Sequence, residues 1–431
     1  MRLLTADTPE CRAFLAGLEA RAHKPDPGVE ASVRSILEDV RERGDAALFE
    51  YSRRFDGLDL TAETVRVPEA EIAAAAAAQP APLLAALRLA AERIAAFHRR
   101  QLRESWLAEE DGIGITGQLI RPLARVGLYV PGGSAAYPSS VLMNAIPAAV
   151  AGVAEIAMCT PAGRDGGIPS AVLAAAHLAG VREVYRVGGA QAIAALAFGT
   201  ACIPRVDKVV GPGNIYVATA KRLVFGAVGI DMVAGPSEVL IIADEAAPVR
   251  FVAADLLAQA EHDPLASAIC LTPSRAQAEA VQAEVLRQLT ELPRRETAAQ
   301  ALERYGAVVV VPDLPAAAAL ANRIAPEHLE LLVADPWGLL PALRTAGALF
   351  LGAHSPEVAG DYLAGPNHVL PTAGSARWSS PLSVDDFQKR SSLVCLRPEA
   401  LMRWREPLLQ LARQEGLEGH ARSIAVRTET P

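Results

Sequence analysis

The chain has 431 residues, more than one ordinary hydrophobic core accommodates, so the sequence predicts at least two domains. Hydrophobic residues make up 51% and charged residues 21% of the chain, a composition that favours a globular protein and excludes a disordered one. The net charge of −8 argues against a basic surface for nucleic acid, so no nucleic-acid partner is expected.

The N-terminus lacks the long apolar segment of a signal peptide, and no uncharged apolar stretch is long enough for a clean membrane span. The five cysteines are widely spaced and odd in number, which argues against a disulfide framework and a cysteine-based zinc site. Together these features predict a cytoplasmic enzyme without a membrane partner.

Residues 1–120 form the first predicted segment and are mainly helical, because apolar positions recur at helical spacing through an alanine-rich stretch. Its end contains the sequence GIGITG at 112–117, which matches a dinucleotide-binding pattern by letter. No strand precedes it and no helix follows it, so we expect these glycines to belong to a hairpin.

Residues 121–234 repeat a strand–turn–helix unit four times, which predicts a parallel sheet covered by helices. Residues 235–380 restart the rhythm as a second α/β domain, which the N-terminal segment is expected to join. A Gly-, Ser- and Pro-rich stretch at 355–390 predicts a long functional loop. Residues 381–431 are predicted as a helical tail. The predicted fold is therefore α/β, with two Rossmann-like parallel-sheet domains, a helical N-terminal segment and a C-terminal helical tail.

Three glycine turns end strands of the 121–234 block, at Gly132–Gly133, Gly188–Gly189 and residues 211–214 (GPGN). Helix N-termini at such turns present free N–H groups to anions, and glycine allows close approach of a ligand. Each turn alone is ordinary α/β turn chemistry. Three of them at neighbouring strand ends make nucleotide binding an equally good interpretation.

The stretch DLLAQAEHDP at 255–264 predicts a helix that carries Gln259 and His262 three residues apart. Residues at that spacing lie about 60° apart around a helix, so both side chains can reach one ion. A simple hydrogen bond between the two side chains is the competing interpretation. Asp361 and His420 also stand in polar, glycine-rich surroundings, and the four residues together offer two nitrogen and two oxygen donors, a set that suits zinc or manganese.

Glu327 and His328 lie side by side in the sequence APEHLE, just before a predicted strand. A carboxylate and an imidazole at a strand end can act as acid and base, although the segment could equally be a connector. Neighbouring residues of an extended chain point apart, so the two side chains are expected to serve different atoms.

Nearly the whole chain resembles the histidinol dehydrogenase family. The resemblance rests on long, ordered strings rather than on a lone motif: GLYVPGGSAAYPSSVLMNAIPA, VGGAQAIAALAFGT, KVVGPGNIYVATAKR, AGPSEVLIIAD, DLLAQAEHDP, APEHLE, GDYLAGPNHVLPT, DFQKR and EGLEGHA.

This resemblance implies a zinc-dependent, NAD-linked oxidation of L-histidinol to L-histidinaldehyde and then to L-histidine, with two NAD+ consumed. It places one zinc ion per subunit on Gln259, His262, Asp361 and His420, and the acid–base pair on Glu327 and His328, with His328 as base and Glu327 activating water. It places substrate contacts on Ser237, Gln259, His262, His328, Asp361, His368, Glu415 and His420. It places cofactor contacts on Tyr129, Gln191 and Asn214.

The resemblance also implies an intertwined homodimer with shared active sites, in which the partner chain supplies the C-terminal histidine ligand. Two other interpretations remain open. One is a related zinc- and NAD-dependent dehydrogenase that acts on another polar alcohol, such as a sulfonated one; Glu415 and His368 argue against it. The other is a non-catalytic metal-bound or nucleotide-sensing protein, which would tolerate the loss of Glu327 and His328.

Overall fold

A computed structural model describes residues 1–22, 26–132 and 136–429, so Gly133 of the first glycine turn lies outside the described residues. Two compact units make up the chain: residues 1–101 with 123–387, and residues 102–122 with 388–431. The first unit contains two parallel sheets covered by helices, which confirms the predicted α/β fold class.

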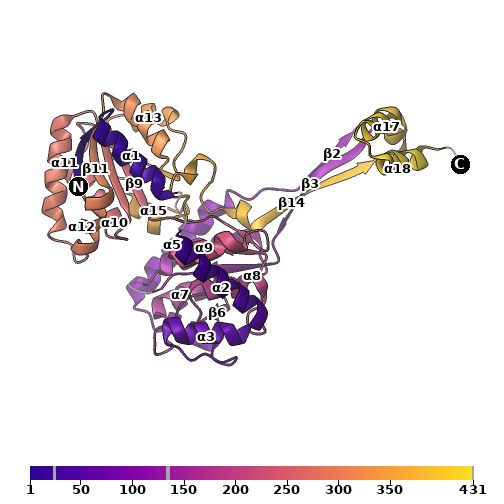
Figure 1. Cartoon of the computed structure of the whole chain (residues 1–431), viewed down its shortest axis with the longest axis horizontal. Helices are drawn as coiled ribbons and strands as arrows, with labels where there is room; N and C mark the ends of the chain where they lie inside the picture. The colour runs from indigo at the N-terminus through magenta and orange to yellow at the C-terminus, as the bar shows by residue number, and fades with distance from the viewer. Residues whose placement is uncertain (23–25, 133–135, 430–431) are drawn as a thin grey trace. The chain divides into compact units, whose positions relative to one another are not determined.

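The larger sheet has six parallel strands in the order β1-β11-β10-β9-β12-β13. Helices α10 (Val249–Ala260), α11 (Arg275–Leu289) and α12 (Arg295–Tyr305) cover one face, and α1 (Pro9–Ala22) and α13 (Leu314–Ile324) cover the other (Figure 1). The strands are β1 (Arg2–Thr5), β9 (Glu238–Ala243), β10 (Ser267–Thr272), β11 (Gly306–Val310), β12 (His328–Leu332) and β13 (Ala348–Leu351).

The smaller sheet has five parallel strands in the order β6-β5-β4-β7-β8. These are β4 (Arg125–Tyr129), β5 (Glu155–Cys159), β6 (Glu183–Tyr185), β7 (Lys208–Val210) and the short β8 (Gly229–Ile230), which the sequence did not predict. Helices α4 (Glu69–Ala77), α5 (Ala81–Arg99), α6 (Pro138–Ala151) and α7 (Ser170–Leu178) pack on one face. Helices α2 (Pro27–Arg43), α3 (Asp45–Asp56), α8 (Gly189–Phe198) and α9 (Ile215–Val224) pack on the other.

The N-terminal segment is divided between the two sheets, which differs from the prediction that residues 1–120 are helical and join the later domain. Residues 2–5 form strand β1, which pairs with β11 of the larger sheet. Helices α2 to α5 instead bury apolar side chains such as Val33, Leu48 and Ile94 against the smaller sheet. Periodicity identifies an apolar helix face, but it does not say which sheet that face covers.

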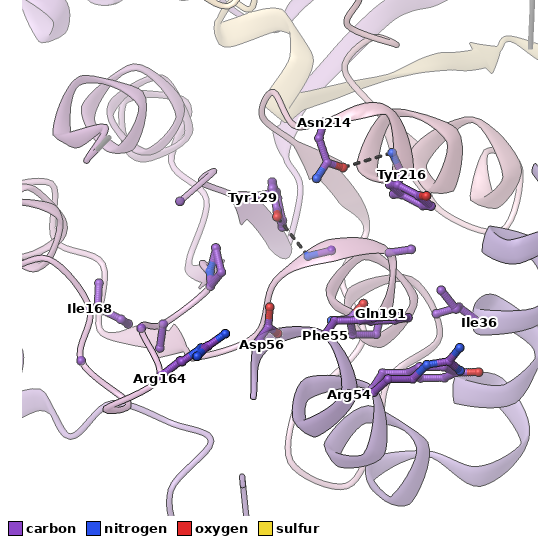
Figure 2. A pocket seen from close by; sticks show the side chains of 18 of the residues that line it. Ile36, Arg54, Phe55, Asp56, Tyr129, Arg164, Ile168, Gln191, Asn214 and Tyr216 are labelled. Atoms are coloured by element: carbon purple, nitrogen blue, oxygen red, sulfur yellow. Dashed lines mark hydrogen bonds between the residues drawn. The ribbon is translucent and has the colours of Figure 1, made fainter. Parts of the chain in front are cut away.

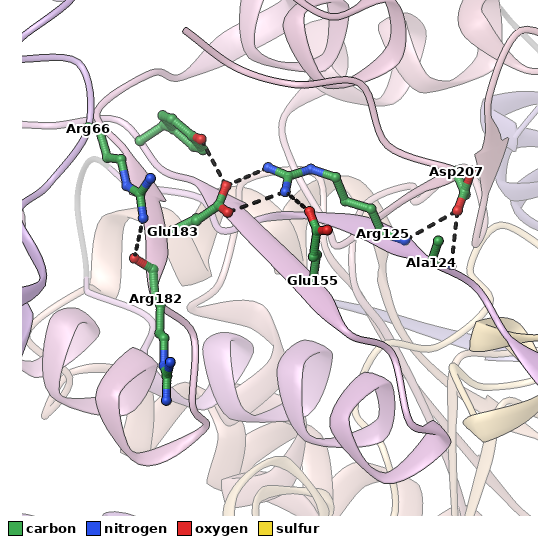
Figure 3. Close-up of polar contacts among 8 residues, drawn as sticks. Arg66, Ala124, Arg125, Glu155, Arg182, Glu183 and Asp207 are labelled. Atoms are coloured by element: carbon green, nitrogen blue, oxygen red, sulfur yellow. Dashed lines mark hydrogen bonds and ion pairs between the residues drawn. The ribbon is translucent and has the colours of Figure 1, made fainter.

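Arg125 joins the amino ends of three neighbouring strands of the smaller sheet (Figure 3). Its guanidinium donates to Glu155 at the start of β5 and to Glu183 at the start of β6, and the Tyr185 hydroxyl donates to Glu183 at 2.9 Å. The main-chain N–H of Arg125 donates to Asp207 at 3.2 Å, just before β7. This network links the amino ends of the strands, whereas the glycine turns follow their carboxyl ends, so we assign the network a structural role.

The second unit is an antiparallel sheet in the order β14-β3-β2, followed by three helices. The predicted helical tail at 381–431 therefore differs from the structure, since residues 388–396 form strand β14. The hairpin expected at GIGITG is confirmed, because β2 (Trp106–Glu110) pairs with β3 (Gly114–Pro122). The helices are α16 (Pro398–Arg403), α17 (Arg405–Gln414) and α18 (Glu418–Thr428).

Among the described residues, no single helix is long and apolar enough to cross a membrane; α4 and α5 meet that test only as a pair, bent by 113°.

Candidate active site

Glu327 and His328 stand at the amino edge of the larger sheet, where the strand order reverses between β9 and β12. His328 is the first residue of β12 and is buried. Its Nδ1 lies 3.0 Å from the carbonyl oxygen of Glu238, a geometry in which Nδ1–H donates and fixes the tautomer. Nε2 is buried without a hydrogen-bond partner among the described residues and lies 3.8 Å from Asp361 Oδ1.

Burial lowers the pKa of His328, because the imidazolium would lose its hydration, while the nearby Asp361 carboxylate opposes that shift. The ring is therefore neutral near pH 7, with an unprotonated Nε2. A neutral imidazole held through Nδ1 by a carbonyl group and open at Nε2 is equipped to accept a proton.

The Glu327 carboxylate accepts the main-chain N–H of Glu238 at 2.8 Å and lies 3.7 Å from His328 Nδ1. Burial raises the pKa of Glu327 well above its ordinary value. A carboxylate with a raised pKa is a stronger base once it ionises. Both predicted acid–base residues thus lie together, nearer one another than the alternation of an extended chain suggested.

Helix α10 ends at Ala260, earlier than predicted, so Gln259 lies in the helix and His262 in the turn after it. The N–H of His262 donates to the carbonyl of Gln259 at 3.3 Å. In one orientation of the Gln259 amide, both of its polar atoms form hydrogen bonds. The N–H group donates to both oxygens of Glu357 at 3.0 Å, and the oxygen accepts from the N–H of Glu238 at 3.1 Å. The amide oxygen retains a second lone pair for a ligand.

Asp361 lies in the short helix α15 (Glu357–Tyr362), where the sequence predicted a loop. His368 Nδ1 lies 3.0 Å from the carbonyl oxygen of Asp361, so these two residues hold one another in place. His262 is close enough to His328 and His368 to lower the pKa of both rings, after the larger effect of burial. His262, His328, Asp361 and His368 therefore share one neighbourhood. Ser237 precedes Glu238, the first residue of β9, at the same sheet edge.

Within the described residues, no three His, Cys, Asp or Glu side chains gather as a group that could hold a metal ion. Of the predicted ligands in the first unit, only His262 and Asp361 belong to those residue types, and Gln259 adds an amide oxygen. These three residues are nonetheless donors that zinc accepts. The Nε2 of His328, which has no partner among the described residues, can accept a proton beside them.

Glu415 and His420 lie in the second unit, around the connection between α17 and α18. Both are exposed, and both line a hollow of about 330 Å³ between these helices. The structure therefore brings these two predicted residues together.

A larger cavity, of about 1260 Å³, opens beside the carboxyl ends of β4 and β7, where the order of the smaller sheet reverses (Figure 2). All three predicted cofactor residues line it. The Tyr129 hydroxyl accepts the N–H of Gly189 at 3.0 Å, and Asn214 Oδ1 accepts the N–H groups of Tyr216 and Val217 at 3.0 and 3.2 Å. Switch points of parallel sheets are favoured ligand sites.

Sequence reasoning missed a set of buried carboxyl groups behind the acid–base pair. Glu330 follows His328 on the same face of β12, and its Oε1 accepts the N–H of Glu357, the first residue of α15, at 2.7 Å. Glu330 Oε2 has no hydrogen-bond donor among the described residues, and a protonated Glu330 can itself donate to Asp255. The alternation His328–Glu330 in a strand was the available signal for this residue.

Replacing Glu330 with glutamine is expected to stabilise the protein at alkaline pH. Burial, and then the charge of Asp255, raises the pKa of Glu330 to about 9, above its ordinary 4.5. A folded-state pKa raised in this way means that stability is lost as pH rises from the unfolded to the folded value. Glutamine keeps the acceptor for Glu357 and the donor for Asp255 without a proton to lose.

Thermal unfolding of E330Q and of the wild-type protein at pH 5 and pH 8.5 checks this expectation. The melting temperature of E330Q should exceed that of the wild type by about 2 °C or more at pH 8.5, and the difference should be smaller at pH 5. The same difference at both pH values would contradict a protonated Glu330.

The fold and the site define an α/β enzyme with a nucleotide-sized cavity and a buried imidazole–carboxylate pair. Comparison with known proteins gives the family. The family model for histidinol dehydrogenase matches residues 19–428. The chain is 56% identical to the histidinol dehydrogenase of Syntrophotalea carbinolica over 427 residues, covering 99% of each chain. It is 56% identical to that of Rhizobium meliloti over 428 residues, covering 99% of this chain and 98% of the relative.

The crystal structure of histidinol dehydrogenase from Elizabethkingia anophelis matches with a TM-score of 0.92 at 38% identity, and covers 99% of this chain and 98% of that one. The chain belongs to the histidinol dehydrogenase family, and it is an oxidoreductase.

Proposed function

We propose that this chain oxidises L-histidinol to L-histidine through L-histidinaldehyde, using zinc and two NAD+. The observation that carries the proposal is the buried, neutral His328, whose open Nε2 lies beside Asp361 and whose neighbour is Glu327. Membership of the histidinol dehydrogenase family supplies the substrate class.

Zinc would be held by Gln259, His262, Asp361 and His420. These residues provide two imidazoles, a carboxylate and an amide oxygen, a donor set that zinc accepts. A zinc ion so held would supply a Lewis acid that polarises and orients the substrate alcohol. The amide hydrogen bonds to Glu357 and the His368–Asp361 contact would orient two of the ligands.

NAD would occupy the cavity lined by Tyr129, Gln191 and Asn214. The volume of about 1260 Å³ accommodates a dinucleotide, and the first turn of helix α8, after Gly189, offers main-chain N–H groups to phosphate. NAD+ supplies the hydride acceptor for both oxidations.

Two side chains of this protein would move the protons. His328 Nε2 accepts the hydroxyl proton of the alcohol as hydride leaves its carbon. Glu327 accepts a proton from the water that attacks the aldehyde. His328 releases its first proton to solvent and then accepts the hydroxyl proton of the resulting diol in the second oxidation. Each oxidation removes two electrons, so two NAD+ are consumed for each histidinol.

The substrate would contact residues in the first unit of one subunit and residues in the second unit of the partner subunit. Those in the first unit surround the acid–base pair, and those in the second line the small hollow. They are Ser237, Gln259, His262, His328, Asp361, His368, Glu415 and His420.

A homodimer with shared active sites is part of the proposal. The second unit has only a small apolar core of Leu409, Ala412 and Ala421, yet it exposes large apolar side chains. Trp106, Leu107, Val394, Leu411 and Val426 are each more than half exposed. A partner subunit would cover such a surface, and it would bring Glu415 and His420 to a complete site. Cytoplasmic location remains a prediction from the sequence.

Replacing His262 with asparagine is expected to remove zinc and activity together, because zinc loses one imidazole while the acid–base pair is untouched. Metal analysis of the purified variant should give a zinc content near zero, against about one ion per chain in the wild type. His354→Asn, an exposed histidine outside the predicted ligand set, is the matched control. Full zinc occupancy in H262N would refute the ligand assignment, and faster oxidation of a sulfonated alcohol than of histidinol by the wild type would refute the substrate.

A further inference from the structure

A buried lysine–aspartate pair holds both main-chain polar groups of Gly211. Lys221, on α9, donates through Nζ to the carbonyl oxygen of Gly211 at 2.7 Å and forms an ion pair with Asp231. Asp231, which follows β8, accepts the N–H of Gly211 at 2.8 Å. The Lys221 side chain is 2% exposed and that of Asp231 is not exposed at all.

Gly211 lies where the chain leaves β7 and crosses the end of β4. Its φ of +112° is strained for any other residue, and a Cβ atom there would overlap the carbonyl oxygen of Tyr129. The ion pair therefore fixes the close approach of the 211–214 turn to Tyr129, the last residue of β4. Asn214, at the other end of this turn, uses its oxygen to cap α9, which leaves its amide N–H groups available to the cavity.

Stability alone does not account for this pair. Removing two charges from water costs several kcal/mol each, and well-packed apolar residues in place of a buried ion pair are often neutral or stabilising. Because Lys221 and Asp231 both form hydrogen bonds with the main chain of Gly211, the pair determines where that glycine lies.

We propose that Lys221 and Asp231 are positioning residues for the dinucleotide: they hold the 211–214 turn where Tyr129 and Asn214 can contact it together. The inference rests on the proposed function, since it requires that the cavity binds NAD. Neither residue lines the cavity, so both act through the turn.

The double variant K221M/D231L tests this role, because it removes the hydrogen bonds of both side chains to Gly211 without leaving an unpaired buried charge. Its zinc content should stay close to that of the wild type, and its melting temperature should fall, because the N–H and the carbonyl oxygen of buried Gly211 lose their partners. Its Kd for NAD+, measured by calorimetry, should rise about 10-fold or more, and KM for NAD+ should rise while KM for histidinol does not. Arg222→Met is the matched control. Arg222 follows Lys221 on α9, and the substitution breaks its exposed ion pair with Glu30.

An unchanged Kd for NAD+ in a folded double variant would overturn the inference and leave the proposed function standing. Failure of the wild-type protein to bind NAD+ would overturn both. If the double variant does not fold, D231N serves in its place. Asparagine keeps an acceptor for the N–H of Gly211 but weakens the hold on Lys221, so an intermediate rise in Kd is expected and an unchanged Kd again contradicts the inference.

Discussion

Replacing His328 with asparagine is expected to lower kcat for histidinol oxidation by about 10²- to 10⁴-fold, the range for loss of a general base. Asparagine fills similar space, but its amide cannot take a proton at the position of the open Nε2. Because His328 is not among the proposed zinc ligands and does not line the cofactor cavity, zinc content and NAD+ affinity should be unchanged.

Steady-state kinetics with purified H328N, together with metal analysis, gives the measurement. His177→Asn is the control, because His177 is exposed on α7 of the smaller sheet. A variant that keeps a kcat within about threefold of the wild type would show that His328 is not the base, given the size of the effect expected for such a residue.

Glu327→Gln is expected to stop the reaction after its first oxidation. The amide keeps the size of the carboxyl group but cannot accept a proton from the attacking water, so hydration of the aldehyde slows by about 10²-fold or more. Histidinaldehyde should accumulate, and NADH formed per histidinol consumed should fall towards one. Trapping the aldehyde with a hydrazine reagent while NADH is monitored at the same time measures both quantities.

The matched control is Glu330→Gln, the same substitution three residues along the chain, at a buried carboxyl group without a proposed role in proton transfer. It should keep two NADH per histidinol. If E327Q also kept two, Glu327 would not be the residue that activates water.

The sequence was sufficient for most strands of the two parallel sheets and for the position of Glu327 and His328 before a strand, because both depend on local patterns. Strand–turn–helix repeats predicted the parallel sheets, and APEHLE placed a carboxylate and an imidazole at a strand end, where His328 opens β12. The sequence did not predict which sheet α2 to α5 would cover, because an apolar helix face does not identify the sheet against which it packs. It also missed the short helix that carries Asp361, whose six residues are too few for a periodic signal.

Interactions between distant segments lay beyond sequence reasoning. Lys221 donates a hydrogen bond to Gly211 and forms an ion pair with Asp231, but these residue types are common and their spacing follows no motif. The hydrogen bond from the N–H of Glu357 to Glu330 is another example, because it joins residues 27 positions apart that no motif connects.

The central claim is a four-electron oxidation of histidinol, and the ratio of NADH formed to histidinol consumed tests it most directly. The purified wild-type protein, supplied with zinc and excess NAD+ and limiting L-histidinol, should form about two NADH per histidinol, with L-histidine as the product, because each of the two oxidations transfers one hydride. One NADH per histidinol with free aldehyde released, or no NADH at all, would contradict the proposed function.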